Sequence, residues 1–144
     1  MEKFILPVEI RWSDLDPNFH LRHSVYYDFG AYARIQFLTQ AGLTPFYLQE
    51  HKFGPIIFRE ECVFRKELQF GDAVTIDLAA ITARKDYSRW SIRHHIYKNA
   101  DTLAAVLTID GSWIDTSLRK LTIPTAHAQS VFASMPRDSA FVWQ

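Results

Sequence analysis

The sequence contains little that would suggest a disulfide framework, a nucleic-acid partner or a membrane. One cysteine, Cys62, is present among 144 residues, so an intramolecular disulfide cannot form and the reducing cytoplasm is the simpler expectation. Sixteen basic and 16 acidic side chains cancel, which removes long-range attraction to nucleic acids and anionic membranes. No apolar run approaches the ~18 residues of a membrane span. The apolar stretch near the N-terminus is too short for a signal-peptide core.

The composition instead suits a protein that buries a substantial core. Hydrophobic residues make up 48% of the chain and aromatic residues 15%, which excludes disorder over most of the length. A chain of 144 residues has the length of one ordinary domain. We therefore predict a single domain over residues 1–144 without a nucleic-acid or membrane partner.

The N-terminal residues predict one strand followed by a loop. Residues 4–12 are rich in β-forming side chains and alternate after Pro7, and a proline there suggests an edge strand. Residues 13–22 carry turn-forming side chains, which predict a loop or one short helical turn.

Three later segments predict helices. Residues 24–41 place apolar side chains at helical spacing, with Ser24 as the expected N-cap and Gly42 at the left-handed position that follows many helices. A shorter helix is predicted over residues 44–51, where a proline follows a threonine. Residues 125–135 have helical potential, and the last few residues of the chain are expected to fray.

Beyond Gly54 the hydrophobic period changes from helical to alternating. Four segments alternate polar and apolar side chains and are joined by short turns, a pattern typical of an antiparallel meander. These predicted strands cover residues 55–68, 73–84, 89–98 and 102–115.

Together these elements predict one long helix against a five-stranded antiparallel sheet, an α+β arrangement. The helix covers one face of the sheet, whereas the other face and the edges need cover of their own. Trp90 and Trp113 on neighbouring strands are expected to add exposed apolar surface. We therefore predict a homodimer or a homotetramer.

The segment "SDLDPNFHLRHSVYY", residues 13–27, gathers side chains that suit three different roles. Asp14, Asp16, His20 and His23 are compatible with turns and caps, with a metal site, or with catalysis. Asp14 is best interpreted as a cap or salt-bridge residue. A metal site is disfavoured because no third ligand follows at a recognisable spacing.

Two other groups with chemical potential are better interpreted as structural. His94 and His95 lie on an alternating strand, so their rings point to opposite faces and cannot ligate one ion together. Cys62 has no activating neighbour in the sequence and is expected to be a small buried side chain.

The order of elements and the stretch "WSDLDPNFHLRHSVYYDFGAYARIQFL" resemble the hot-dog-fold thioesterases, close to the 4-hydroxybenzoyl-CoA thioesterase group. "ELQFGDAVTID" and "WIDTSLRKLTIP" resemble recurring segments of the same group. The resemblance implies a sheet wrapped around one long central helix. The group's Asp-Pro pattern, with His or Tyr seven positions later and then a Tyr in a helix, is matched by Asp16, Pro17, His23 and Tyr26.

A second pattern overlaps the first. The acyl-carrier-protein thioesterases of the wider fold carry Asp-x-Asn-x-His, which Asp16, Asn18 and His20 match. Bacterial acyl-CoA members usually have a glycine just after the aspartate, where this chain has Asn18 and Phe19. The identity of the acyl carrier, CoA or a carrier protein, is therefore left open.

The resemblance implies hydrolysis of an acyl thioester, without a cofactor. Asp16 would be the nucleophile or the general base. The backbone N–H near His23, at the helix start, would polarise the thioester carbonyl. His20 or His23 would orient water or substrate, and Asn18 would hold Asp16 or the water.

Substrate contacts are predicted from side-chain chemistry. CoA phosphates require basic groups, and basic side chains flank one hairpin turn and follow the last long strand, at Arg119 and Lys120; charged turns are equally typical of a solvated sheet end. Aromatic side chains would line an acyl pocket, although core packing is the safer interpretation for any one of the candidates, which are Tyr26, Tyr27, Phe58 and Trp90. The residues predicted to bind substrate are Tyr26, Phe58, Arg84, Lys85 and Arg89.

Two other functions are compatible with the same fold. One is an acyl-thioester-binding or regulatory module that does not cleave its ligand. The other is a hydratase or dehydratase, although its different His/Asp arrangement is not found in this sequence. The fold alone does not separate these functions, because one scaffold can host several activities.

Overall fold

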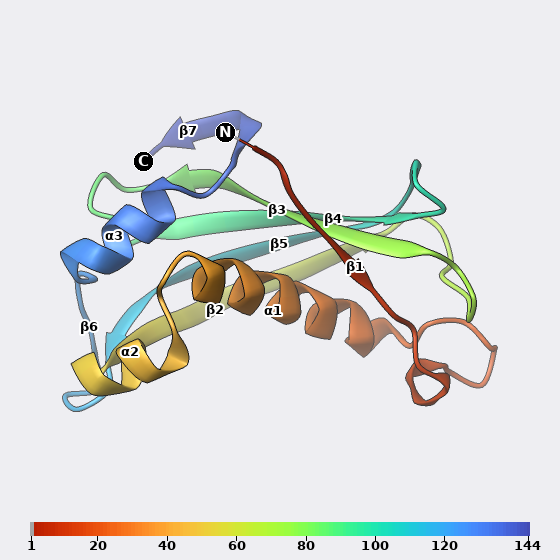
Figure 1. Cartoon of the computed structure of the whole chain (residues 1–144), viewed down its shortest axis with the longest axis horizontal. Helices are drawn as coiled ribbons and strands as arrows, with labels where there is room; N and C mark the ends of the chain where they lie inside the picture. Colours follow the sequence, from red (N-terminus) through yellow and green to blue (C-terminus); the bar gives the residue numbers. More distant parts are fainter. Residues whose placement is uncertain (1) are drawn as a thin grey trace.

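The computed structural model, which describes residues 2–144, shows a curved sheet with one helix against its inner face (Figure 1). The helix α1 spans His23–Gln40. The five strands of the sheet follow the order β1-β3-β4-β5-β2 and pair antiparallel. They are β1 (Phe4–Val8), β2 (Phe53–Phe64), β3 (Val74–Ala83), β4 (Trp90–Lys98) and β5 (Thr102–Asp115).

Five smaller elements complete the chain. The α+β class and the hot-dog fold are confirmed, but two short strands extend the predicted five-stranded sheet: β6 pairs with β5, and β7 pairs parallel with β3. No helix within residues 2–144 is both long and apolar enough to cross a bilayer. The smaller elements are a 3₁₀ turn (Trp12–Asp14), α2 (Pro45–His51), β6 (Lys120–Leu121), α3 (Ala126–Ala133) and β7 (Arg137–Trp143).

Several predicted element boundaries are wrong. β2 spans Phe53–Phe64 instead of residues 55–68. The first strand ends at Val8 instead of residue 12, because its pairing partner β3 begins at Val74, opposite Val8. Trp12 belongs to the following 3₁₀ turn and packs edge-on against Phe70. The long helix begins one residue earlier than predicted, with Arg22 at the N-cap position instead of Ser24.

The aromatic end of the core corrects the prediction of exposed tryptophans. Trp90 and Trp113 are only 4% and 0% exposed. Phe132 of α3 packs against both rings, with centroids at 5.5 and 5.1 Å. The C-terminal helix of the chain itself therefore covers the surface that we assigned to a partner.

The C-terminal residues form a strand instead of fraying. Residues of β7 pair with Ala80–Ala83 of β3, and the Gln144 N–H donates to the Ala83 carbonyl. β1 pairs with the other half of the same strand, from Val74 to Leu78. The first and last strands thus share one margin of the sheet (Figure 1).

The opposite margin of the sheet is the long strand β2, which pairs only with β5 among the described residues. Its exposed apolar side chains lie in two pairs on either side of a charged centre that includes Arg59 and Glu61. An open edge that carries apolar side chains is a surface for pairing with another strand. The exposed fractions are 44% for Ile57, 47% for Phe58, 43% for Val63 and 49% for Phe64.

Candidate active site

The segment between the 3₁₀ turn and α1 is a tight hairpin. The Arg22 N–H donates to the Asp14 carbonyl, and the Asp16 N–H donates to the His20 carbonyl at 2.9 Å. The Phe19 N–H closes the turn by donating to the Asp16 carbonyl, and Phe19 takes the left-handed φ of 65°. This geometry is a type I turn followed by one left-handed residue, and a proline suits its second position. The hairpin brings Asp16 and His20 side by side.

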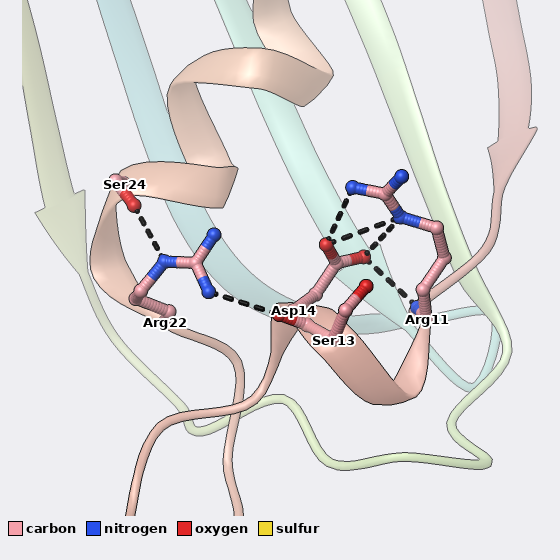
Figure 2. Close-up of polar contacts among 5 residues, drawn as sticks. All are labelled: Arg11, Ser13, Asp14, Arg22 and Ser24. Carbon is pink, nitrogen blue, oxygen red and sulfur yellow. Dashed lines mark hydrogen bonds and ion pairs between the residues drawn. The ribbon is translucent and has the colours of Figure 1, made fainter.

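Asp14 anchors the base of this hairpin, as Figure 2 shows. Its carboxylate is 2% exposed and accepts from the backbone N–H of Arg11 at 2.9 Å and from the Arg11 guanidinium at 2.8 Å. The Arg11 hydrogen bond holds the pKa of Asp14 below its ordinary value. On the other arm, Arg22 donates to the Ser13 carbonyl and to Ser24 Oγ. The prediction of a salt-bridge role for Asp14 is confirmed.

Asp16 stands at the hairpin turn with its carboxylate oriented by several donors. Oδ1 accepts from the Asn18 N–H at 2.8 Å and, more weakly, from the His20 N–H at 3.4 Å. His20 Nδ1 lies 2.9 Å from Oδ2, and because a carboxylate accepts, Nδ1 carries the proton. The Asp16 side chain is 22% exposed. It is therefore held in position and still open to solvent or substrate.

The start of α1 supplies hydrogen-bond donors beside this hairpin. Arg22 makes no side-chain capping bond to the first turn. Among residues 2–144, the N–H groups of His23 and Ser24 have no recorded acceptor, whereas the Val25 N–H donates to the Arg22 carbonyl. Free N–H groups and the helix dipole favour negative charge at this end.

A cavity of about 410 Å³ connects these groups. Asp16, His20, His23 and Tyr26 all line it, so the structure brings together most of the predicted catalytic residues. The exception is Asn18, which does not line the cavity. It holds Asp16 through its backbone N–H and not through its side chain.

The cavity also contains residues that we did not predict. Phe64 packs edge-on against Tyr26 with centroids at 4.9 Å, and Arg65 and Lys66 follow at the end of β2. The sequence offered one signal: two adjacent basic residues near the end of the strand predicted over residues 55–68. That signal gains meaning only once the pairing of the strands places this strand end beside α1.

Most of the predicted substrate-binding residues lie at the other end of the sheet. Phe58, Arg84 and Arg89 line a separate cavity of about 280 Å³, and Arg89 stacks over the Phe58 ring at 4.6 Å. Lys85 does not line it and instead sits over the Trp143 ring at 4.0 Å. Figure 1 shows the hairpin between β3 and β4 at the opposite end from the Asp16 hairpin. Within one chain, these residues and Asp16 do not form one site.

The remaining candidates have structural surroundings. Cys62 is partly buried, and burial raises its pKa to about 11, so it is a thiol at neutral pH. His94 faces the core, whereas His95 lies on the outer face against Asp77, as the alternation predicts. In residues 2–144, no three His, Cys, Asp or Glu side chains are grouped to hold a metal ion.

Comparison with known proteins adds family information to this geometry. The family model of the thioesterase-like superfamily matches residues 10–136. A search of curated proteins gave no significant match. The structural similarity is extensive: a hypothetical protein from Staphylococcus aureus, solved in complex with CoA, superposes with a TM-score of 0.85 at 18% identity, over 96% of this chain and 89% of its own.

Two further solved structures are named as thioesterases. A 1,4-dihydroxy-2-naphthoyl-CoA thioesterase from Synechocystis has a TM-score of 0.82 at 15% identity, over 92% of this chain and 97% of its own. A thioesterase from Thermus thermophilus, complexed with coenzyme A and zinc, has a TM-score of 0.76 at 21% identity, over 93% and 96%. At these identities the structures support the fold, and the family match covers nearly the whole chain. The chain therefore belongs to the thioesterase-like superfamily, among the thioester hydrolases of the hot-dog fold.

Proposed function

We propose that this protein hydrolyses an acyl-CoA thioester to the free acid and CoA, with Asp16 as the nucleophile or general base. The observation that carries the proposal is the position of Asp16, an oriented and partly exposed carboxylate in one cavity with the start of α1. Similar structures bound to CoA support CoA as the carrier. Arg65 and Lys66 at the same cavity suit its phosphates.

The geometry suits the two requirements of thioester hydrolysis. As a general base, Asp16 would take a proton from water as the water oxygen bonds to the carbonyl carbon. As a nucleophile, Asp16 would form that bond itself and give an acyl-Asp16 anhydride, which water then hydrolyses to the free acid and the free Asp16 carboxylate. In either route the carbonyl oxygen becomes negative before the C–S bond breaks and the thiolate leaves. The free N–H groups of His23 and Ser24 would stabilise that oxygen. His20, bonded to Asp16, would keep the carboxylate oriented.

The proposed catalytic unit is the domain of residues 1–144 paired with a second copy through β2. Antiparallel pairing of two β2 strands would place Ile57 and Phe58 of one copy beside Val63 and Phe64 of the other. Phe58 belongs to the cavity with Arg84 and Arg89, and Phe64 belongs to the Asp16 cavity. The pairing would thus bring the cavity of Phe58, Arg84 and Arg89 of one copy and the Asp16 cavity of the other copy to the same seam. A homodimer suffices for this arrangement.

The outer face of the sheet gives no comparable argument for a tetramer. Its polar side chains are mostly paired within the chain: His95 pairs with Asp77, and Ser91 donates to Asp110. Arg93 lies 4.0 Å from Asp138, and its buried Nε has no hydrogen-bond partner among residues 2–144. A polar face without an exposed apolar patch gives no reason to expect a partner that covers it. For a CoA-dependent enzyme with a single cysteine in thiol form, the cytoplasm is the compartment that we propose.

The direct test is release of free thiol from a panel of acyl-CoAs, aliphatic and aromatic, by the wild type and Asp16→Asn. We expect a loss of at least a hundredfold in kcat with an unchanged melting temperature, because Asp16 lies in a surface hairpin. Asp28→Asn is the matched control: it makes the same change on an exposed carboxylate of α1 that does not line the Asp16 cavity. It should retain activity.

Each contrary result would lead to a different conclusion. Undiminished hydrolysis by Asp16→Asn would remove Asp16 from the reaction. If the wild type hydrolyses no CoA ester, the same panel on a carrier protein tests the second motif, Asp16-x-Asn18-x-His20. Tight binding of the thioesters without cleavage in either form would favour the non-catalytic binding module.

A further inference from the structure

Beneath the C-terminal half of α1 lies a third cavity of about 230 Å³, which the proposed mechanism does not use. Its volume is that of about eight liquid waters, which suits a single ring or a medium-length chain and not a whole CoA. Ile57, at its edge, is 44% exposed. Its walls are almost entirely apolar, with one charged exception, Arg34; the apolar side chains include Leu38, Ile57, Leu78, Trp90 and Met135.

The position of the Arg34 guanidinium is set by a buried histidine. His94 is fully buried, and its Nδ1 lies 2.8 Å from the Asp77 carbonyl oxygen, which can only accept, so Nδ1 carries a proton. Burial lowers the pKa of His94 to about 4, so at neutral pH its Nε2 is unprotonated. Nε2 accepts from Arg34 Nη1 at 3.0 Å. A Cβ on Gly30 would stand 3.1 Å from Nη1, so glycine leaves room for this contact.

The guanidinium is largely buried and only loosely paired. Its side chain is 12% exposed, and it forms an ion pair with Glu60 in which Nη2 lies 3.7 Å from the carboxylate oxygen, beyond hydrogen-bond distance. Of its five N–H groups, one forms a hydrogen bond within residues 2–144, to His94. Because His94 is neutral, it orients Arg34 without neutralising it. Buried cations are normally paired and fully hydrogen-bonded, so free donors in an apolar cavity suit an acceptor on a ligand.

We propose that this cavity binds the far end of the acyl group, and that Arg34 selects acyl groups carrying an oxygen acceptor there, a carboxylate above all. This inference rests on the proposed thioesterase function. Within one chain, Arg34 stands about 16 Å along α1 from His23. Pairing of two β2 strands would shorten this separation. It would bring Phe64 of the second copy, which lines an Asp16 cavity, beside Ile57 of the first copy, which lines an Arg34 cavity. The thioester would therefore sit in the Asp16 cavity of one copy and the acyl end in the Arg34 cavity of the other.

The test compares three acyl-CoAs of equal length that differ only at the last carbon: methyl, hydroxyl and carboxylate. In the wild type we expect kcat/KM to rise from the methyl to the carboxylate ester. In Arg34→Met the carboxylate ester should lose about tenfold to a hundredfold, as expected for a hydrogen bond to a charged group, while the methyl ester loses little. Arg34→Lys, which keeps the charge but not the planar fork, should fall between them.

A second readout does not depend on hydrolysis. Free monocarboxylic acids should raise the melting temperature of the wild type and of Asp16→Asn more than primary alcohols of equal length, and this difference should vanish in Arg34→Met. Glu60→Gln, which removes the nearest competing carboxylate, should enlarge it. Equal shifts for the acid and the alcohol in every variant would overturn the Arg34 proposal, even if hydrolysis succeeds. A shift that depends on Arg34, without any hydrolysis, would instead count against the proposed enzyme alone.

Discussion

Two aspartates separated by one residue have opposite surroundings. Asp14 is buried against Arg11, which lowers its pKa, and its carboxylate secures the 3₁₀ turn. Asp16 is partly exposed at a cavity that also contains His20. The sequence could separate the two residues: it predicted a salt-bridge role for Asp14, and it singled out Asp16 as the catalytic candidate because Asp16 alone matched the family patterns. It could not predict that the Asn18 backbone would orient Asp16, because that bond depends on the turn conformation.

A pH dependence follows from the buried His94. Its pKa in the folded protein is about 4, below the ordinary value of about 6.5, so the unfolded chain binds a proton there first as pH falls. Stability is therefore lost between about pH 6.5 and pH 4. From this shift, the free energy of unfolding should fall by about 2 kcal/mol between pH 7 and pH 5.

Denaturant unfolding at pH 7 and pH 5 measures this loss, with His94→Gln as the reference that cannot titrate. The raised pKa of His95, caused by its hydrogen bond to Asp77, acts in the opposite sense but equally in both proteins. The loss in the wild type should exceed that in the variant by about 2 kcal/mol. Equal losses, or an NMR titration of His94 near pH 6.5, would contradict the assignment.

At the scale of elements, the contact between β4 and β5 depends on one glycine. Gly111 lies opposite Trp90, and a Cβ there would stand 2.7 Å from the Ile56 carbonyl oxygen and even nearer to two carbons of the Trp90 ring. The ring is itself packed against Phe132 of α3. Gly111→Ala would therefore force the indole away from its site against α3.

We expect Gly111→Ala to lower the free energy of unfolding by about 1–3 kcal/mol, the usual cost of overpacking a core. Gly54→Ala on β2 is the matched control, because a Cβ there meets no atom within 4 Å. Its change should stay within about 0.5 kcal/mol. Urea denaturation monitored by tryptophan fluorescence measures both, and similar values for the two variants would show that the indole moves without cost.

The predicted elements were found where periodicity is strong and missed where tertiary contacts decide. β5 was predicted with its observed bounds and α1 to within one residue, because both carry long, regular apolar patterns. β7 was missed: its "RDSAFVW" is short and alternates poorly, and it becomes a strand through pairing with β3. The prediction that Trp90 and Trp113 are exposed was wrong for a related reason. Alternation shows which face of the sheet a side chain lies on, but it does not show what covers that face.

At the scale of the whole molecule, dimerisation through β2 is the testable assembly. Val63→Arg places a charge on the exposed edge strand and should convert the protein to a monomer with much reduced thioesterase activity, because the proposed site combines residues of two copies. Sedimentation velocity and thiol release on the same samples measure both effects.

Val142→Arg is the matched control: it makes the same substitution on a side chain that is 63% exposed in β7, at the other margin of the sheet. It should remain a dimer with full activity. A dimer that survives Val63→Arg and dissociates with Val142→Arg would move the interface to the β7 margin. A fully active monomer would remove the need for a composite site.

The shared margin of β1 and β7 has a consequence for growth of the assembly. These two short strands run in opposite directions along β3, and β1 contains Pro7, so this margin offers no continuous edge to an incoming strand. Pairing through β2 would be symmetric and would use the only long edge among the described residues of each copy. In the proposed dimer, addition would therefore stop at two copies and would not propagate into a filament, because the placement of the two chain ends leaves no second long edge.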